Sequence, residues 1–271
     1  MNNQENDQKA FDHSTHQEFV DYYAKQSLTD ASIQRMRGIY DCVNRNLKQR
    51  GIMQKLNVAD IGCGTGEMSI MWAQDGHNVH GLDVNEALLD IARQRAKDES
   101  LNIEFSLGSA TSLPWEDASM DVCIAPELLE HVVEWELCLT EFVRILKPNG
   151  VLYISTANKL CPIQEEFDLP LYSWYPSPIK RYCENLARTT HPHIAGYAKY
   201  PAVNWFSFYQ LKEVLLKMEM ESFDRFDIMD EGKIAEHKKT ILRLIKQSSF
   251  LRLIGYMLSP ELSMLAVKKL Q

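Results

Sequence analysis

Three residues near the middle of the chain are of types that bind metal ions or move protons. They are Glu127, Glu130 and His131, in the segment PELLEHV that begins at Pro126. If this segment is helical, the three side chains share one face, because residues three and four apart are neighbours on a helix. They could then hold a divalent metal ion, a transition metal better than Mg²⁺. Alternatively, His131 could act as a general base tuned by Glu130, or the segment could serve structure and positioning alone.

A second stretch has the glycine spacing of a ligand-binding turn. From position 58 the chain reads VADIGCGTGE, so Asp60 precedes glycines at 62, 64 and 66. Glycine tolerates positive φ and has no Cβ, so such a turn between a strand and a helix brings backbone N–H groups against a ligand. The third glycine comes one residue too early for the dinucleotide pattern, and the phosphate-binding pattern is absent. An acid before the turn suits a cationic amino-acid ligand better than a pyrophosphate, although a glycine turn can also bind nothing.

The elements that would position these residues alternate between strands and helices. Apolar runs predict core strands at about 57–61, 78–83, 103–107, 120–125 and 151–156. Asn85 and Ser207 are residue types typical of helix N-caps, and each is expected to begin a helix. Such alternation is typical of an α/β fold with a mainly parallel, doubly wound sheet. Because the carboxyl ends of parallel strands form the ligand crevice, we expect Gly62, Gly64, Asp83 and Ala125 to converge. Asp83 could accept hydrogen bonds from both hydroxyls of a ribose, or it could be a solvated acid at a strand end.

Two motifs carry a resemblance to a known family. The run DIGCGTG followed by glutamate resembles motif I of the class I S-adenosylmethionine-dependent methyltransferases. The pattern E-x-x-E-H resembles the ubiquinone-pathway O-methyltransferases of the methyltransferase type 11 group, in which these positions bind a divalent cation that positions the acceptor hydroxyls. Small-RNA 3′-end methyltransferases share this pattern, and many class I enzymes carry the Glu-His pair without a metal. The resemblance implies a seven-stranded Rossmann-like sheet, S-adenosylmethionine as methyl donor and S-adenosylhomocysteine as product.

The resemblance also indicates which residues would bind the cofactor. The candidates are Asp60, Gly62, Cys63, Gly64, Gly66, Asp83, Val84, Ser109, Ala110, Ala125 and Pro126. In the family an acid often stands at the position of Ser109 and holds the adenine, so serine is a departure. The adenine contact would then come from Ser109 Oγ or from the backbone of Ala110. The candidate catalytic residues are His131 and Glu130, and Glu127, Glu130 and His131 are the candidate metal ligands.

The rest of the chain is expected to frame this core. We predict a helical N-terminal lid over residues 1–50, a cofactor-binding core over 51–160 and an inserted substrate cap over 161–206. Residues 207–271 would complete the core, with strands near 222–229 and 262–268 and a basic insertion at 233–258 of one helix or two. The insertion could lie on an anionic membrane, or it could be the solvated face of a packed helix.

Composition restricts the function classes. The formal net charge is −8, which disfavours a nucleic-acid partner, because duplex binders usually carry a basic face. The six cysteines are scattered without a C-x-x-C pair, which indicates reduced thiols and a cytoplasmic location. No apolar run is long enough to span a bilayer. The sequence does not indicate an oligomeric state.

These observations together predict a methyltransferase that acts on a small molecule. The acceptor is expected to be a hydroxyl group on a quinone-like, sugar-like or lipid-like compound. Methylation of nitrogen or carbon on another metabolite is an alternative. A non-catalytic protein that binds S-adenosylmethionine for regulation or assembly, and a nicotinamide dehydrogenase, are alternatives of other classes.

Overall fold

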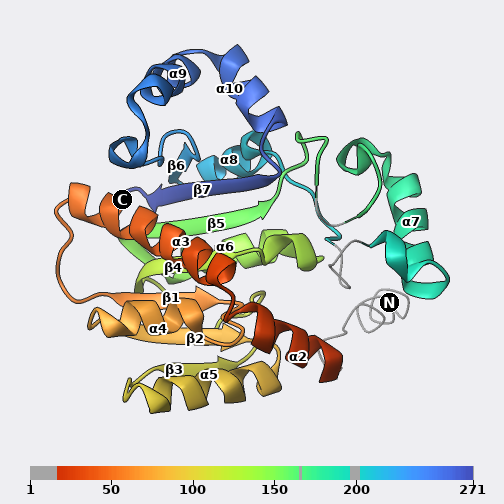
Figure 1. Cartoon of the computed structure of the whole chain (residues 1–271). Coiled ribbons are helices and arrows are strands. Elements are labelled where there is room, and N and C mark those ends of the chain that lie inside the picture. The colour runs from red at the N-terminus through yellow and green to blue at the C-terminus, as the bar shows by residue number, and fades with distance from the viewer. Residues whose placement is uncertain (1–16, 165–166, 196–201, 271) are drawn as a thin grey trace.

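The computed structural model describes residues 17–164, 167–195 and 202–270, which form a seven-stranded sheet flanked by helices (Figure 1). The strands are β1 (Asn57–Ile61), β2 (Asn78–Asp83), β3 (Glu104–Leu107), β4 (Met120–Pro126), β5 (Leu146–Ala157), β6 (Met220–Asp224) and β7 (Glu261–Lys268). Their order is β3-β2-β1-β4-β5-β7-β6, and only β7 runs antiparallel to its neighbours. The predicted α/β fold with a mainly parallel, seven-stranded Rossmann-like sheet is confirmed.

The two faces of the sheet bury two separate apolar clusters. Helices α3 (Asp30–Gln49) and α4 (Glu67–Gln74) pack on one face, where β1 contributes Val58. Helices α6 (Trp135–Ile145) and α8 (Phe208–Lys217) pack on the other face, where β1 contributes Ala59. Successive strand residues thus enter opposite cores, as the strand pleat requires. Both faces are covered, which explains why the central strands read as continuous apolar runs.

Local capping signals place two of the helices. Asn85 Oδ1 accepts the backbone N–H of Leu88 at 3.2 Å and begins α5 (Glu86–Asp98). Ser207 Oγ accepts the N–H of Gln210 at 3.2 Å and begins α8. Such side chains replace hydrogen-bond partners that the first turn of a helix lacks. Both caps were predicted from sequence.

The described part of the predicted N-terminal lid is helical but is not one continuous helix. It consists of two helices, α2 (Gln17–Gln26) and α3, with Thr29 capping α3 by accepting the N–H of Ser32. The apolar spacing persists across the break, so periodicity alone did not reveal it. Residues 1–16 of the predicted lid lie outside the described residues.

The segment predicted as a cap contains a regular helix that the sequence pattern did not reveal. Helix α7 (Ser177–Thr189) begins after Pro176, and Pro178 lies in its first turn, where proline is tolerated. Beside α7, the rings of Phe167 and Tyr172 stack with centroids 4.1 Å apart. In Figure 1 this helix stands beyond the carboxyl ends of the central strands.

The C-terminal part completes the sheet and adds a helical pair. Strand β6 ends at Asp224, five residues before the predicted end at Met229, because Asp224 Oδ1 accepts the N–H groups of Phe226 and Asp227 and turns the chain. The basic insertion forms two helices, α9 (Glu236–Gln247) and α10 (Ser249–Met257). Among the helices of the described ranges, none combines the length and apolar character of a membrane span.

All six cysteines have free thiols in the structure, and five of them are buried. This agrees with the reduced cysteines that the sequence indicates. The cytoplasmic location stays a prediction.

Candidate functional site

The glycine turn after β1 contains three glycines with positive φ, but only one of them faces open space. The φ angles of Gly62, Gly64 and Gly66 are 71°, 53° and 86°. A Cβ at Gly62 would lie 3.2 Å from Leu128 Cδ1, and one at Gly66 would lie 2.9 Å from Ala92 Cβ. A Cβ at Gly64 would meet no atom within 4 Å. Packing therefore explains two of the glycines, whereas the backbone of Gly64 is open to a ligand.

Asp83 ends β2 beside this open backbone. Its Oδ2 accepts the N–H of Gly64 at 2.8 Å, and its Oδ1 accepts the N–H of Asn85 at 2.9 Å. Burial raises the pKa of Asp83, and these backbone donors oppose the rise. A carboxylate oxygen can accept more than one hydrogen bond, so the two oxygens keep acceptor capacity for hydroxyl groups of a ligand. Asp83 is thus held in place by the turn itself.

Asp60 lies beneath the turn, with 1% of its surface exposed. Ser69 Oγ, in α4, donates a hydrogen bond of 2.6 Å to Asp60 Oδ2. Burial raises the pKa of Asp60 to about 6, the Ser69 bond opposes the rise, and the charge of Asp83 adds to it. Asp60 therefore links β1 to α4 and places a costly buried carboxylate under the ligand-facing turn.

This buried carboxylate predicts an unusual pH dependence of stability. The folded protein holds the proton of Asp60 more tightly than the unfolded chain, so ionisation at higher pH lowers the free energy of unfolding. We expect the free energy of unfolding of Asp60→Asn, relative to that of the wild type, to increase by about 1–2 kcal/mol as the pH is raised from about 5 to about 8. Urea unfolding across this range measures the difference. Asp90→Asn, which alters an exposed acid in α5, is the control. A constant Asp60→Asn difference at every pH would contradict the assignment.

Two exposed apolar side chains flank the Asp83 side of the site. Val84, after β2, is 62% exposed, and Leu107, which ends the neighbouring strand β3, is 58% exposed. Ala110 is buried, whereas Ser109 is exposed and its Oγ lies 2.7 Å from Thr111 Oγ1. Sequence analysis missed Leu107, although an apolar residue at the carboxyl end of an edge strand was a signal that could have identified it.

The other candidate cofactor ligands offer backbone atoms more than side chains. The Cys63 side chain is buried against Gly81, and burial raises the pKa of its thiol. Ala125 is fully buried in the core on the α6 side of the sheet. Pro126, partly buried, is the last residue of β4.

The segment after β4 is not an α-helix, which corrects the predicted arrangement of its three polar residues. Glu127 has a φ of 50°, and only a 3-10 turn over Leu129–His131 follows. Glu127 forms an ion pair with Arg35 of α3, Glu130 is 3% exposed, and His131 is exposed. These side chains therefore do not share a face. Within the described parts of the chain, no group of three His, Cys, Asp or Glu residues is arranged to hold a metal ion. The predicted metal centre of Glu127, Glu130 and His131 is not assembled.

His131 is open to solvent but crowded by protein. The surrounding protein disfavours the imidazolium and lowers the pKa of His131, and the charge of Glu127 opposes this effect. The imidazole is therefore mainly neutral at neutral pH. A neutral, accessible imidazole beside the end of β4 can accept a proton from a ligand.

The segment predicted as a cap is hydrogen-bonded directly to the turn that carries His131. The backbone carbonyl of Glu130 accepts the N–H groups of Val203 at 2.8 Å and Asn204 at 3.0 Å. Asn204 Nδ2 also donates to the carbonyls of Leu129 and Val132, at 3.0 and 2.7 Å. Sequence analysis missed Asn204, which lies more than seventy positions from its partners.

Arg95 of α5 connects the N-terminal helices to the glycine turn. Its guanidinium donates to the carbonyl of Ala24 and to Ser27 Oγ, both at 3.2 Å, and to the carbonyl of Thr65 at 3.3 Å. It also forms an ion pair with Glu67, the first residue of α4. Arg35 and Arg95 thus hold α3 and α2 against the site. Sequence analysis missed both residues, because no local sequence pattern indicates these contacts.

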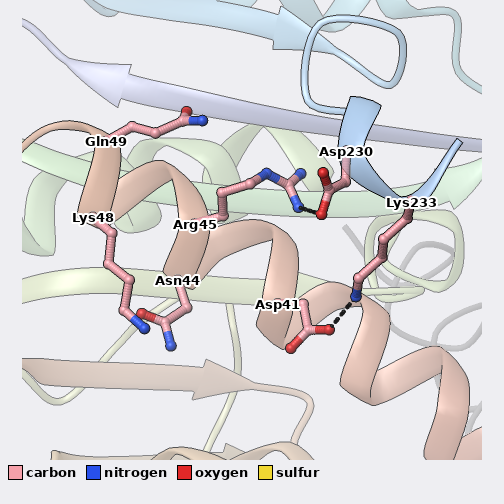
Figure 2. A pocket seen from close by; sticks show the side chains of 7 residues that line it. All are labelled: Asp41, Asn44, Arg45, Lys48, Gln49, Asp230 and Lys233. Carbon is pink, nitrogen blue, oxygen red and sulfur yellow. Dashed lines mark hydrogen bonds and ion pairs between the residues drawn. The ribbon is translucent and has the colours of Figure 1, made fainter. Parts of the chain in front are cut away.

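A separate hollow of about 470 Å³ lies between α3 and the turn at 231–233 (Figure 2). Its lining is entirely polar or charged: Asp41, Asn44, Arg45, Lys48, Gln49, Asp230 and Lys233. Two ion pairs, Arg45 with Asp230 at 3.1 Å and Lys233 with Asp41 at 2.7 Å, satisfy four of these side chains. None of these lining residues is a candidate cofactor-binding or catalytic residue, so this hollow is not the candidate active site.

A family comparison identifies the central part of the chain. Residues 59–154 match the family model described as "Methyltransferase domain". The match includes Asp60, the glycine turn, Asp83 and His131. Residues 59–154 form a methyltransferase domain. The family resemblance inferred from the motifs is confirmed.

Relatives of the methyltransferase domain share its sequence over part of their length. Over 113 residues the chain is 32% identical to a ubiquinone biosynthesis O-methyltransferase of Coxiella burnetii, covering 42% of this chain and 48% of that protein. Over 148 residues it is 32% identical to a demethylmenaquinone methyltransferase of Lactococcus lactis subsp. lactis, covering 52% and 59%. The chain thus spans about half the length of the curated relatives it matches.

A solved structure shares the fold of the methyltransferase domain and its flanking elements. It is magnesium protoporphyrin IX methyltransferase from Synechocystis PCC 6803 with bound S-adenosylmethionine. The TM-score is 0.51 at 16% identity, and the match covers 89% of this chain and 82% of that one. At this identity the likeness shows the fold alone.

Proposed function

We propose that this protein transfers a methyl group from S-adenosylmethionine to a hydroxyl group of a small molecule. The observation that carries the proposal is the open backbone of Gly64 beside the Asp83 carboxylate, at the carboxyl edge of a methyltransferase domain. The names of two relatives, a ubiquinone biosynthesis O-methyltransferase and a demethylmenaquinone methyltransferase, support a quinone-like acceptor. Sugar-like and lipid-like acceptors remain within the proposal.

The residues around the turn fit the proposed cofactor. Asp83 would accept hydrogen bonds from the ribose hydroxyls, and Val84 and Leu107 would provide apolar contacts to the adenine, with Ser109 or Ala110 at its polar edge. The open backbone of Gly64 would lie against the amino-acid part, with Cys63 contributing main-chain atoms only. Asp60 beneath the turn would favour the positive charge of the ligand. When bound, the cofactor supplies an electrophilic methyl group.

The protein must then orient the acceptor, exclude water and remove a proton. His131 would take that proton, and its exposure and lowered pKa support this role. Glu130 is buried in the segment that carries His131, which suits a positioning residue better than a direct proton acceptor. The cap would cover the acceptor, since Asn204 bonds it to this segment. No metal ion is included, because the candidate ligands do not converge.

Replacing His131 by asparagine tests the proton step. We expect kcat to fall about a hundredfold, the lower end of what a general base contributes, with the affinity for S-adenosylmethionine unchanged. The acidic limb of the wild-type pH–rate profile should lie below the usual histidine range, because the pKa of His131 is lowered, and it should vanish in the variant. His193→Asn, in an exposed cap histidine, is the matched control. Equal pH profiles for wild type and His131→Asn would contradict the role.

The acceptor can be sought directly. The protein is incubated with methyl-labelled S-adenosylmethionine and fractionated metabolite extract, with and without a chelator, and labelled products are analysed by mass spectrometry. An O-methyl product whose rate of formation is unchanged by the chelator is the expected result. An N- or C-methyl product would refute hydroxyl transfer, and tight cofactor binding without transfer to any extract would favour a non-catalytic protein. Loss of activity in the chelator, restored by one metal, would refute the metal-free site.

A further inference from the structure

Helix α10 presents an apolar stripe to solvent. Its exposed apolar residues are Phe250, Leu253, Ile254 and Met257, and the C-cap residue Leu258 continues the series, at positions i, i+3, i+4, i+7 and i+8. Phe250 is 69% exposed and Leu258 is 75% exposed. A helix on the surface of a globular protein usually turns polar side chains outward. This stripe is therefore a surface that folding leaves uncovered.

The stripe is not the result of a loosely attached helix. The opposite side of α10 carries Tyr256, fully buried, whose hydroxyl donates to Asp224 Oδ2 at 2.7 Å. Arg252 pairs with the same oxygen at 2.6 Å and with Asp227 at 3.0 Å. Asp224 is itself fully buried with both oxygens bonded, so the network fixes which side of α10 faces outward.

The neighbouring helix α9 also carries exposed apolar side chains. Ile241 is 56% exposed and Leu244 is 51% exposed. In Figure 1 the two helices lie together on the side of the molecule next to β6 and β7. Exposed apolar side chains on two neighbouring helices are typical of a docking surface for a membrane or a protein.

The charges around this surface favour one partner. Residues 237–260 contain no aspartate or glutamate but five lysines and arginines, in a chain with 37 acids and a net charge of −8. Lys246 and Arg252 form ion pairs with Glu231 and Asp224. Lys238 and Arg243 are exposed, and the guanidinium of Arg243 lies 4.0 Å from the Glu231 carboxylate. Apolar residues bordered by exposed cations match the interfacial layer of an anionic bilayer.

The surface also adjoins the candidate site. Asn158, just after β5, donates through Nδ2 to the carbonyls of Tyr256 at 2.9 Å and Ser259 at 2.7 Å. The C-terminal end of α10, which carries Leu258, is thereby held at the carboxyl edge of the sheet. A bilayer bound by α10 would lie next to the edge at which the methyltransferase domain has its open turn.

We propose that the pair α9–α10 docks this protein on an anionic lipid bilayer. The α10 stripe enters the headgroup layer, and Lys238 and Arg243 contact the anionic headgroups. The inference does not depend on the proposed methyl transfer, because it rests on the surface outside the candidate site.

Vesicle co-sedimentation tests the proposal without any activity measurement. We expect binding to vesicles of phosphatidylcholine with about 30% phosphatidylglycerol, at least about tenfold weaker binding to pure phosphatidylcholine, and weakening by salt. The double variant Phe250→Glu and Leu258→Glu should bind at least about tenfold less, because it places charges in the apolar stripe. Met53→Glu is the matched control, since Met53 is 77% exposed on a loop before β1.

Other outcomes would overturn the inference. Thermal unfolding and circular dichroism must match the wild type for each variant, as expected for exposed positions. Lys238→Glu with Arg243→Glu tests the charge requirement, and binding of this variant to the anionic vesicles as tightly as the wild type would contradict it. Absence of wild-type binding would refute the proposal. So would a concentration-dependent dimer that the stripe variant abolishes, because the stripe would then be covered by a second copy.

Discussion

Replacing Asp83 by alanine is expected to weaken S-adenosylmethionine binding by about a hundredfold or more. Its carboxylate is the proposed acceptor for two ribose hydroxyls, and hydrogen bonds to a charged group contribute about 1.5–3 kcal/mol each. The substitution also leaves the N–H groups of Gly64 and Asn85 without this acceptor, so the turn loses two hydrogen bonds that hold its conformation. Isothermal titration calorimetry with S-adenosylmethionine and S-adenosylhomocysteine measures the loss.

Two further variants separate charge from shape. Asp83→Asn keeps one acceptor oxygen at the same place and should bind with intermediate affinity. Asp90→Ala removes an exposed carboxylate of α5 that pairs with Arg93, and it should bind as the wild type does. If Asp83→Ala bound S-adenosylmethionine as tightly as the wild type does, the proposed contact of Asp83 with the ribose would be refuted. Tighter binding of a nicotinamide dinucleotide than of S-adenosylmethionine would refute the proposed cofactor.

Two alanine substitutions in the glycine turn should have opposite consequences. At Gly66 the new Cβ would lie 2.9 Å from Ala92 Cβ and 3.3 Å from Phe105 Cζ, at a φ of 86°. Overpacking and left-handed strain together predict a loss of about 3 kcal/mol in the free energy of unfolding. At Gly64 the new Cβ meets no protein atom. Only strain of about 1 kcal/mol is expected there, with at least tenfold weaker cofactor binding because the methyl group occupies ligand space.

Urea unfolding measures the stability of both variants, and calorimetric titration measures their affinity for S-adenosylmethionine. The expected pattern is a stability defect in Gly66→Ala and a binding defect in Gly64→Ala. Gly51→Ala is the control, because Gly51 also has a positive φ and open surroundings but lies outside the turn. Wild-type cofactor affinity in Gly64→Ala would show that the open backbone is not the ligand face.

The candidate site joins three parts of the chain that are distant in sequence. Arg95 attaches α2 to the glycine turn, Arg35 attaches α3 to Glu127, and Asn204 attaches the cap to the turn that carries His131. Cofactor and acceptor would therefore bind between the domain core and elements that flank it on both sides in sequence. This arrangement suits methyl transfer, which needs orientation and exclusion of water.

The sequence by itself determined the features that depend on neighbouring residues. Alternating strand and helix patterns predicted the sheet, the glycine spacing predicted the ligand-facing turn, and Asn85 and Ser207 predicted two caps. These signals are local: a cap needs only its own first turn, and a positive φ selects glycine wherever it occurs. The family of the domain followed from the same short motifs.

The tertiary structure decided everything that depends on which segments meet. The spacing of Glu127, Glu130 and His131 allowed a shared helical face, but Glu127 has a positive φ and pairs with Arg35, and only a 3-10 turn follows, so the segment forms no α-helix that could present such a face. Likewise, the apolar spacing of α10 is that of a helix packed on a core. In the structure, Asp224 bonds Arg252 and Tyr256 on the inner side of the helix, and the apolar stripe faces solvent. Periodicity shows that a helix has an apolar side, and only packing determines whether anything covers it.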